Sequence, residues 1–546
     1  MQFRYVITLI ILFGLFGCED ESTDPNDPKF GNPNEKGITI QFSDVQQTIH
    51  HFGASDGWSA ETIGENWPTA DREKIAELLF SQELDANGHP VGIGLSMWRT
   101  NIGAGSANQL DNGFASGSWF RETECALQPD GSYDWNQGKG SRWFMSQAKS
   151  YGVDYLTGWS TSPPYFMTKN GYTFVTPGHG GFNLKPDQYD DFASYLSEYV
   201  QYHESENLPI DYVSLINEPQ WSWMYDPGSA PQEGSQCTNA EAKTLVEAVN
   251  QQFEADGLSA KIIIPEAGDL EVLHSFKGNL ATSSDQVKTF WDSRSDNYVG
   301  SFPTVEPIVA GHSYWSNSTP QVAIRHREQL HTALETEGID FWQTEYSILG
   351  GDYLQNGQAS NLKDMDYALW MARIIHWDLS IANATGWSWW TSMSYPKFAD
   401  HKYRFGLLNW YPDSENRSNS SGTFEEAKLL WAYGNFSRFI RPGYKRIEVS
   451  NDLFGSLTTE AENLMVSGYI SSDESELVLV FINYSINNVD VPIINYDTAD
   501  GFTITDDTFD VYTTTQSNNL QATRVSATDI TIRGESVVTL VGQLKP

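Results

Sequence analysis

Two glutamates in this sequence each close an apolar run and stand among aromatic side chains. Glu218 follows the run at 212–216 in the string INEPQW, and Glu345 follows the run at 340–344 in QTEYS. Two carboxyl groups that flank one glycosidic bond can hydrolyse it, because one protonates the leaving oxygen while the other attacks the anomeric carbon. We therefore predict that Glu218 is the general acid/base and that Glu345 is the nucleophile. These roles require the carboxyl groups to lie about 5 Å apart and predict retention of configuration.

The residues beside Glu218 suit the same chemistry. The Asn217 amide can hydrogen-bond a sugar 2-hydroxyl, a contact that strengthens in the transition state. Pro219 removes a backbone donor and fixes the turn after the glutamate. A glutamate that merely caps a strand or a helix is common, so either glutamate alone predicts little. The prediction of a catalytic pair is supported by their positions at the ends of the fourth and seventh apolar runs.

Polar and aromatic residues at the other strand ends are candidates for sugar binding. Arg99 next to a carboxylate would hold that carboxylate ionised and oriented. His312 and Tyr314 in the string GHSYW could contact the nucleophile and the ring hydroxyls, while tryptophans could stack on the sugar. For each of these residues taken singly, a purely structural role is an alternative of equal weight to sugar binding. The predicted substrate-binding set is Asp56, Arg99, Asn101, Trp159, Asn217, Trp221, His312, Tyr314 and Trp389.

These residues need a fold that gathers the ends of distant strands at one place. Apolar runs recur between residues 50 and 391 and are separated by amphipathic segments with helical spacing. This α/β alternation is typical of a (β/α)8 TIM barrel, although a doubly wound open sheet would also alternate in this way. Polar or aromatic residues at most strand ends favour the closed barrel. The predicted strands cover residues 52–56, 92–99, 153–159, 212–216, 261–265, 308–312, 340–344 and 385–389.

The sequence changes in character after the barrel segment. From about residue 440 the helical spacing disappears, and short alternating runs are separated by turns rich in Thr, Asn and Asp. This pattern predicts an attached all-β sandwich domain. The segment 37–49 alternates in the same way and is expected to join the sandwich. The predicted domains are therefore the catalytic barrel at 50–435 and the sandwich at 436–546, with one or more strands from 37–49.

The first residues have the character of an export signal. Residues 1–17 carry one early positive charge and a short apolar core, which is typical of a secretory signal peptide. The string LFGC resembles a bacterial lipobox, in which Cys18 becomes the lipidated N-terminus, although an ordinary signal with a chance cysteine is the alternative. Residues 18–36 are acidic and rich in Asp, Pro and Asn, which predicts a disordered tether. We expect anchoring by lipid at the bacterial outer membrane, at the cell surface.

Composition limits the partners. The chain has 33 basic and 71 acidic residues, a formal net charge of −38, which argues strongly against nucleic-acid binding. The same charge argues more weakly against polyanionic polysaccharides and favours a neutral one. Aromatic residues make up 13% of the chain, which suits either sugar-stacking surfaces or a large aromatic core. A monomer that acts on a polysaccharide or oligosaccharide is the expectation.

No metal or cofactor is expected. Cys125 and Cys237 have no metal-ligand spacing around them, and they could either pair in an oxidising compartment or remain free thiols. The string GAG at 103–105 lacks the third glycine of a dinucleotide-binding fingerprint.

Several longer strings give the chain a family resemblance. HHFGASDGWSAE, LSMWRTNIGAGSANQ, TSPPYFMTKNG, INEPQW, GHSYW, QTEYS and WSWW together resemble glycoside hydrolase family 30. The resemblance extends from Gly37 to the C-terminus. It implies a (β/α)8 barrel joined to a side β-sandwich, with a retaining mechanism whose acid/base falls on Glu218 and whose nucleophile falls on Glu345. The WRTNIGAGS string is most similar to the endo-β-1,6-galactanase branch, which implies action on the side chains of arabinogalactan.

Two other functions stay open at this point. The first is exo- or endo-cleavage of another β-linked glycan, such as β-1,6-glucan, xylan, a β-glucoside or a β-fucoside, because loop shape decides the substrate. The second is a non-catalytic surface lipoprotein that binds glycans on a decayed barrel. The presence of both glutamates argues against that decay.

Overall fold

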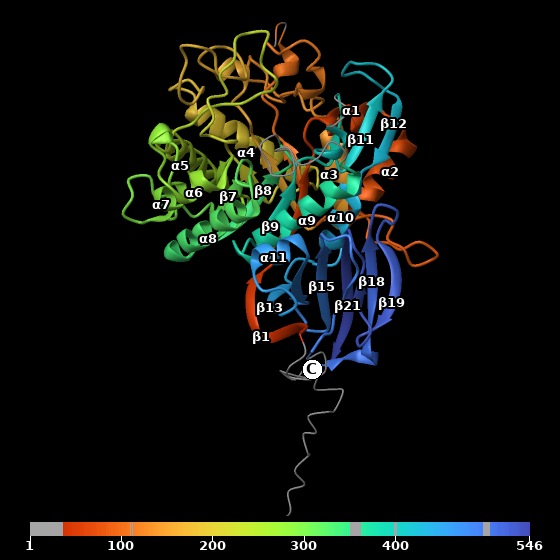
Figure 1. The fold of residues 1–546 in the computed structure, drawn as a ribbon. Coiled ribbons are helices and arrows are strands. Elements are labelled where there is room, and N and C mark those ends of the chain that lie inside the picture. The colour runs from red at the N-terminus through yellow and green to blue at the C-terminus, as the bar shows by residue number, and fades with distance from the viewer. Residues whose placement is uncertain are drawn as a thin grey trace, which may run out of the picture.

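Eight parallel strands close into a barrel in the computed structural model of this chain (Figure 1). The structure describes residues 36–109, 111, 113–349, 362–397, 401–494 and 503–545. Strand β9 pairs with β2, with Gly386 opposite His51, and so completes the ring. The closed barrel is confirmed, and the open sheet is excluded. The barrel strands are β2 (His51–Ser55), β3 (Met97–Asn101), β4 (Tyr155–Trp159), β5 (Tyr212–Ser214), β6 (Lys261–Ala267), β7 (Val305–His312), β8 (Asp340–Tyr346) and β9 (Gly386–Trp389).

The barrel interior is filled at its amino-terminal end, so the site must lie at the other end. Ile263, Ile308 and Trp342 belong to an inner core cluster, whereas their strand neighbours pack against the helices. This alternation follows from the two-residue period of a strand. The His50 ring stacks on Tyr155 at 4.1 Å and packs against Trp342, which adds to the filling. The open end is therefore the carboxyl end of the strands, where barrels of this type place their functional groups.

The helices begin and end at local signals in the sequence. Thr238 and Glu241 form a capping box at the start of α5, and Gly257 ends that helix in a left-handed conformation. Thr319 caps α8 in a similar way and Gly338 ends it. The helices are α1 (Ser59–Asn66), α2 (Thr69–Phe80), α3 (Lys139–Ser150), α4 (Tyr189–Ser205), α5 (Asn239–Asp256), α6 (Leu270–His274), α7 (Gln286–Trp291), α8 (Pro320–Glu337), α9 (Asp364–Ser380), α10 (Lys428–Ser437) and α11 (Leu457–Glu462).

The second barrel strand is shorter than predicted. The apolar run begins at residue 92, but β3 begins at Met97. The backbone N–H groups of Ile93 and Leu95 donate to the carbonyls of Leu78 and Leu79 at the end of α2. The first part of the run therefore donates hydrogen bonds to the free carbonyl groups at the end of α2, and only its second part enters the barrel.

The other domain is an antiparallel β-domain beside the barrel (Figure 1). Its main sheet has the order β1-β13-β14-β15-β21-β18-β19, with β17 also pairing with β21. Strand β1 comes from the amino-terminal side of the barrel, and its Ile38 lies opposite Asn451 of β13. The strands are β1 (Ile38–Thr48), β13 (Lys445–Asn451), β14 (Leu464–Ile470), β15 (Glu476–Asn483), β17 (Thr503–Ile504), β18 (Thr508–Thr514), β19 (Gln521–Ser526) and β21 (Ser536–Lys545), and a two-stranded sheet joins β16 (Val489–Asp490) to β20 (Thr531–Ile532).

The main sheet joins the two domains through one of its faces. On β15, Val478 and Val480 belong to the large core that includes the barrel helices, whereas Leu479 and Phe481 belong to the core of the β-domain. Helix α9 is buried on nearly all sides and contacts β14, β15 and β21. A helix that is apolar all round needs cover on both sides, and the barrel and the sheet provide it.

A small sheet at the open end of the barrel was not predicted. It joins β10 (Met393–Ser394), β11 (Leu408–Pro412) and β12 (Gly422–Glu426), and it follows directly after the last barrel strand. Cys125 and Cys237 are separate buried thiols. The expected signal peptide, Cys18 and the tether lie outside the described residues. In the part of the chain that the structure describes, no helix is both long and apolar enough to cross a membrane.

Candidate active site

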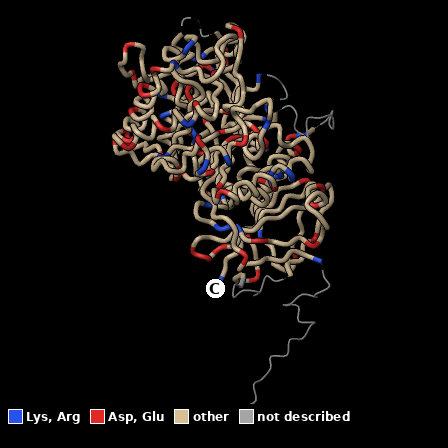
Figure 2. The backbone as a smooth tube through the Cα atoms, turned by 90° about the vertical axis from the view of Figure 1, so that its left-hand side faces the viewer, with Lys and Arg blue, Asp and Glu red and all other residues tan. Residues whose placement is uncertain are grey.

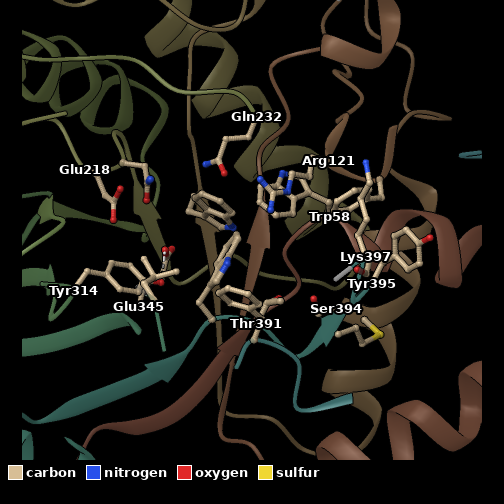
Figure 3. Close-up of a pocket in the computed structure, with 18 of the residues that line it drawn as sticks. Trp58, Arg121, Glu218, Gln232, Tyr314, Glu345, Thr391, Ser394, Tyr395 and Lys397 are labelled. Carbon is tan, nitrogen blue, oxygen red and sulfur yellow. Dashed lines mark hydrogen bonds between the residues drawn. The ribbon is translucent and has the colours of Figure 1, made fainter. Parts of the chain in front are cut away.

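The two predicted catalytic glutamates meet at the open end of the barrel (Figure 3). Glu218 follows β5, and its backbone N–H donates to the carbonyl of Glu266 at 2.9 Å. Glu345 lies in β8, and both glutamates are buried. One carboxylate oxygen of each glutamate and a ring nitrogen of His312 all lie within 4.8 Å of one another. This separation agrees with the distance of about 5 Å between the carboxyl groups of retaining glycosidases.

The Glu345 carboxylate is held at both of its oxygens. Nη1 of Arg99 lies 2.7 Å from Oε2, and the Tyr314 hydroxyl donates to Oε1 at 3.1 Å. Arg99 is itself fixed, since it donates to Ser55 Oγ at 3.0 Å and its guanidinium lies 4.3 Å from the centre of the Trp159 ring. A buried arginine both compensates and orients a carboxylate. The Glu345 side chain therefore has the fixed position that a nucleophile requires.

Glu218 has the environment of a proton donor. Burial raises the pKa of its carboxyl group above the usual range, and the charge of Glu345 raises it further, while the hydrogen bond from His312 acts in the opposite direction. A raised pKa keeps a carboxylic acid protonated closer to neutral pH, which is what general-acid catalysis needs. The two glutamates thus differ in environment as the two roles differ.

A third buried glutamate, Glu266 at the end of β6, completes the site. Its Oε2 lies 2.9 Å from Nε2 of His312, and the Thr344 hydroxyl donates to the same oxygen. Burial alone would raise the pKa of Glu266, but the charge of Arg99 and the hydrogen bonds from His312 and Thr344 lower it to about 2. The Glu266 carboxylate therefore stays ionised at neutral pH, and it lies beneath the cavity without lining it.

His312 links the two sides of the site. Its Nδ1 lies 3.1 Å from Glu218 and 3.9 Å from Glu345, while Nε2 faces Glu266. Burial alone would lower the pKa of His312, but the charge of Glu345 and the hydrogen bonds to Glu218 and Glu266 raise it to about 10. A protonated ring can donate from Nδ1 to the Glu218 carboxyl group and from Nε2 to the Glu266 carboxylate.

The same three side chains could in principle hold a metal ion. Among the described residues, Glu218, His312 and Glu345 are the one group of three whose ligand atoms come this close together. A metal-bound histidine needs a free lone pair, which a protonated ring lacks. Arg99 also already compensates the charge of the Glu345 carboxylate, through its contact with Oε2. The arrangement therefore suits acid–base chemistry better than metal binding.

A cavity of about 280 Å³ opens over the two glutamates. Its walls come mainly from the loops that follow the barrel strands, and they are rich in aromatic rings, which can stack on the apolar faces of sugars. Three predicted substrate-binding residues, Trp159, Asn217 and Tyr314, line this cavity. The aromatic lining consists of Trp58, Phe120, Trp159, Trp223, Tyr314, Trp315, Trp390, Tyr395 and Phe405.

Arg99 and His312 belong to the site without forming its surface. Both are buried, and they contact the carboxyl groups of Glu345 and Glu218 rather than the cavity. Their assignment to substrate binding is replaced by a role in holding Glu345 and Glu218.

Asp56 and Trp389 are corrections to the predicted site, and strand parity explains both. Asp56 accepts hydrogen bonds from the Thr100 hydroxyl and the Asn101 backbone N–H, and it shares its face of the chain with Phe52 and Ala54, which pack outside the barrel. Because successive side chains point to opposite faces, an error of one residue moves a side chain from the mouth to the core.

Trp389 was misassigned by one position. It is buried, and its indole N–H donates to the Phe405 carbonyl on the outer side of β9, in the same core cluster as Trp387. The next residue, Trp390, lines the cavity instead.

Asn101 and Trp221 also differ from their predicted roles. Asn101 is buried and does not border the cavity over the glutamates. Trp221 packs edge-on against Trp315 at 4.9 Å, and it is Trp315 and Trp223 that line the cavity. Trp221 therefore supports the wall instead of forming it.

Several site residues were missed by sequence reasoning. Glu266 directly follows the apolar run at 261–265, so it was a third glutamate closing a predicted barrel strand. The remaining ones lie in the connections that follow the barrel strands, where the residues have no periodic pattern and nothing in the local sequence marks them: Trp58, Arg121, Gln232, Ser394, Tyr395 and Lys397.

Comparisons with known proteins show which family the chain matches. A family model described as O-Glycosyl hydrolase family 30 matches residues 35–403. An endo-beta-1,6-galactanase of Hypocrea rufa is 22% identical over 373 residues, which cover 65% of this chain and 67% of that protein. An exo-beta-1,6-galactobiohydrolase of Bifidobacterium longum subsp. longum is 24% identical over 191 residues, which cover 29% of this chain but 12% of that protein.

One solved structure is similar over almost the whole length. It is that of a conserved exported protein from Bacteroides fragilis, with 32% sequence identity and a TM-score of 0.84. The superposition covers 93% of this chain and 100% of that chain.

Proposed function

Because the chain belongs to O-glycosyl hydrolase family 30 and is an O-glycosyl hydrolase, we propose that it cleaves β-1,6-linked galactan in endo mode with retention of configuration. The observation that carries the mechanism is the approach of the Glu218 and Glu345 carboxyl groups within 4.8 Å. The galactan substrate is supported by the similarity to a protein named as an endo-beta-1,6-galactanase and by the WRTNIGAGS string.

In the first step the glycosidic bond is exchanged for an ester to the protein. The Glu345 carboxylate attacks the anomeric carbon, and the bond from that carbon to the leaving oxygen breaks. The Glu218 carboxyl group gives its proton to the leaving oxygen, so this part of the glycan departs as an alcohol. Arg99 and Tyr314 hold Glu345 during this attack.

In the second step water releases the sugar. Glu218, now a carboxylate, takes a proton from a water molecule that attacks the anomeric carbon, and the bond to Glu345 breaks. Two inversions at the same carbon restore its original configuration. Both glutamates return to their starting protonation states.

The test is product analysis with the purified chain. De-arabinosylated arabinogalactan, β-1,6-glucan and xylan are each digested, and the products are sized while NMR follows the anomeric signals at early times. Short β-1,6-galacto-oligosaccharides of several lengths with an initial β-anomer support the proposal. An initial α-anomer would contradict the mechanism, and products from glucan or xylan alone would contradict the substrate.

A second candidate is exo-action on the same linkage. It is favoured by the similarity to a protein named as an exo-beta-1,6-galactobiohydrolase, although the match covers 12% of that protein. A single short product from the earliest time point, with slow loss of polymer length, would select exo-action. Tight binding of galactan without any cleavage would select the non-catalytic binding role.

We also propose that the mature chain is attached by lipid on Cys18 to the bacterial outer membrane and faces the cell surface. This proposal is supported by the LFGC string and the acidic segment that follows it. Mass spectrometry of the mature N-terminus and protease accessibility on intact cells test it. An unmodified N-terminus in the purified membrane fraction, or release of the Cys18→Ala variant no greater than that of the wild type, would contradict it.

A further inference from the structure

Two basic side chains line the active-site cavity on the side away from the catalytic glutamates. Arg121 ends a short helical turn, Trp119–Arg121, in the loop after β3, and Lys397 follows β10. Figure 3 shows both across the cavity from Glu218 and Glu345. This local positive charge stands out in a chain with 71 acidic and 33 basic residues, whose Asp and Glu positions are spread along the backbone of both domains (Figure 2).

Arg121 is half-buried and has no counter-charge of the kind that the fully buried Arg99 and Arg327 have. Its Nε is buried without a hydrogen-bond partner, and burial lowers its pKa to about 10. No described carboxylate forms an ion pair with it, whereas Arg99 and Arg327 lie 2.7 and 2.8 Å from Glu345 and Asp378. Removing a charge from water is costly unless a partner compensates it.

Aromatic rings hold Arg121 in place without neutralising it. The guanidinium carbon lies 5.1 Å from the centre of the Trp58 ring and 5.3 Å from that of Phe120. Such contacts fix the plane of the guanidinium and leave its N–H groups available to a ligand. Lys397 donates to the Gly117 carbonyl at 3.1 Å and has no carboxylate partner among the described residues.

A row of tryptophans connects this basic end to the catalytic end. Trp58 lies 5.1 Å from Trp390, and Trp390 lies 5.3 Å from Trp159, which carries Arg99 on its face. These rings meet edge to face, so they form a continuous wall and not one stacking plane. A glycan that follows this wall from Glu345 would reach Arg121 with a sugar that is not the one being cleaved. The basic side chains therefore face a neighbouring sugar or its branch.

From these contacts we propose that Arg121 and Lys397 form a subsite for an anionic sugar substituent, a uronic acid carboxylate, carried by the glycan next to the cleavage point. The planar guanidinium fork matches a carboxylate with two parallel hydrogen bonds, and Lys397 adds a second charge. The net charge of −38 favours neutral glycans overall, and this subsite makes a local exception. The inference rests on the proposed galactan hydrolase function and specifies its substrate further.

The experiment compares three β-1,6-galacto-oligosaccharides of equal length. The first is neutral, and the second ends in glucuronic acid. The third is made from the second by chemical reduction of its carboxyl group to an alcohol. For the wild type, kcat/KM is expected to be on the order of tenfold higher for the acid than for its reduced form, about the value of one charge-assisted contact. This preference should shrink as the salt concentration rises.

Variants of single residues test whether the preference for the acid depends on Arg121 and Lys397. Arg121→Gln and Lys397→Gln should each lose most of the preference for the acid, measured as the ratio of kcat/KM for the acid to kcat/KM for its reduced form. Arg524→Gln, an equal charge change on β19 of the β-domain, should keep the preference. Because Lys397 is exposed, its variant remains informative if the Arg121 variant folds poorly. A sulfated oligosaccharide in place of the acid tests whether any anion suffices.

The outcomes separate the two proposals. Equal wild-type rates for the acid and its reduced form, or a preference that survives both variants, would overturn the subsite and leave the galactan hydrolase proposal intact. A sulfate preference as large as that for the acid would overturn the choice of a carboxylate. If no galacto-oligosaccharide is cleaved, the proposed function fails, and calorimetric binding of the acid and its reduced form then tests the subsite alone.

Discussion

Nε2 of His312 lies 2.9 Å from the carboxylate of Glu266, a residue with no place in the predicted site. This contact fixes which ring nitrogen faces which carboxylate. With Nε2 turned to Glu266, Nδ1 faces Glu218 at 3.1 Å. Glu266, which does not line the cavity, thus contributes with Glu345 and Glu218 to the raised pKa of His312.

Replacing Glu266 with Gln is expected to change the pH profile as well as the rate. Loss of the anion lowers the pKa of His312, which Glu266 helps to raise to about 10. A neutral His312 no longer lowers the pKa of Glu218, so the pKa of Glu218 rises. The alkaline limb of kcat/KM, which reports deprotonation of the general acid, should move to higher pH while the maximum falls about tenfold or more. Glu306→Gln, on the amino-terminal part of β7, serves as the control. An alkaline limb that Glu266→Gln leaves at the wild-type pH would refute the coupling between Glu266 and Glu218.

Under the proposed mechanism, variants of Glu218 and Glu345 should respond differently to the leaving group of the substrate. Glu218→Gln is expected to lower kcat on galactan by about 10²–10⁴-fold, because the leaving oxygen loses its proton donor. With an aryl galactoside whose leaving group needs no proton, the same variant should lose much less of the rate of the bond-breaking step. Glu345→Gln should fail on both substrates. Near-normal turnover by Glu345→Gln would show that the roles are wrong.

Asp56 provides a test of structural against substrate-binding roles. Burial raises its pKa to about 7, and hydrogen bonds from Thr100 and Asn101 moderate this rise. The folded state therefore binds the proton more tightly than the unfolded state, and the contribution of Asp56 to stability falls as pH rises from about 4 to about 7. The melting temperature of Asp56→Asn relative to wild type should be higher at pH 8 than at pH 4, by on the order of 1–2 °C. Its KM should be unchanged; a large rise in KM would restore the substrate-binding role.

The neighbouring tryptophans Trp389 and Trp390 should have opposite phenotypes. Trp389→Ala removes a core side chain and is expected to cost about 3–5 kcal/mol of unfolding free energy. Trp390→Ala removes a ring from the cavity and should weaken galactan binding by about 0.5–1.5 kcal/mol with a smaller loss of stability. Thermal unfolding and KM together separate the two, and equal changes in both quantities for both variants would contradict the assigned faces.

The sequence by itself determined the architecture and the two glutamates at its centre. Buried parallel strands are continuous apolar runs, and their ends are marked where polar or turn residues interrupt the run, so each strand could be located from its own residues. Glu218 and Glu345 stand at such ends. The resemblance to family 30 rests on strings at the same strand ends, and the matching family model bears it out.

Only the tertiary structure decided which neighbouring side chains share the site. The pairing of β6 with β7 is irregular between Pro265 and Ala267, and Glu266 there has φ 58°. Strict alternation from the inward Ile263 would turn Glu266 outward, but the irregularity lets it reach Arg99 and His312 inside the barrel. Irregular pairing depends on the partner strand, and the cavity wall depends on loops packed against one another, so neither is encoded in a local pattern. Strand ends are local properties of the chain, whereas the direction of a side chain at a bulge is a property of the assembled sheet.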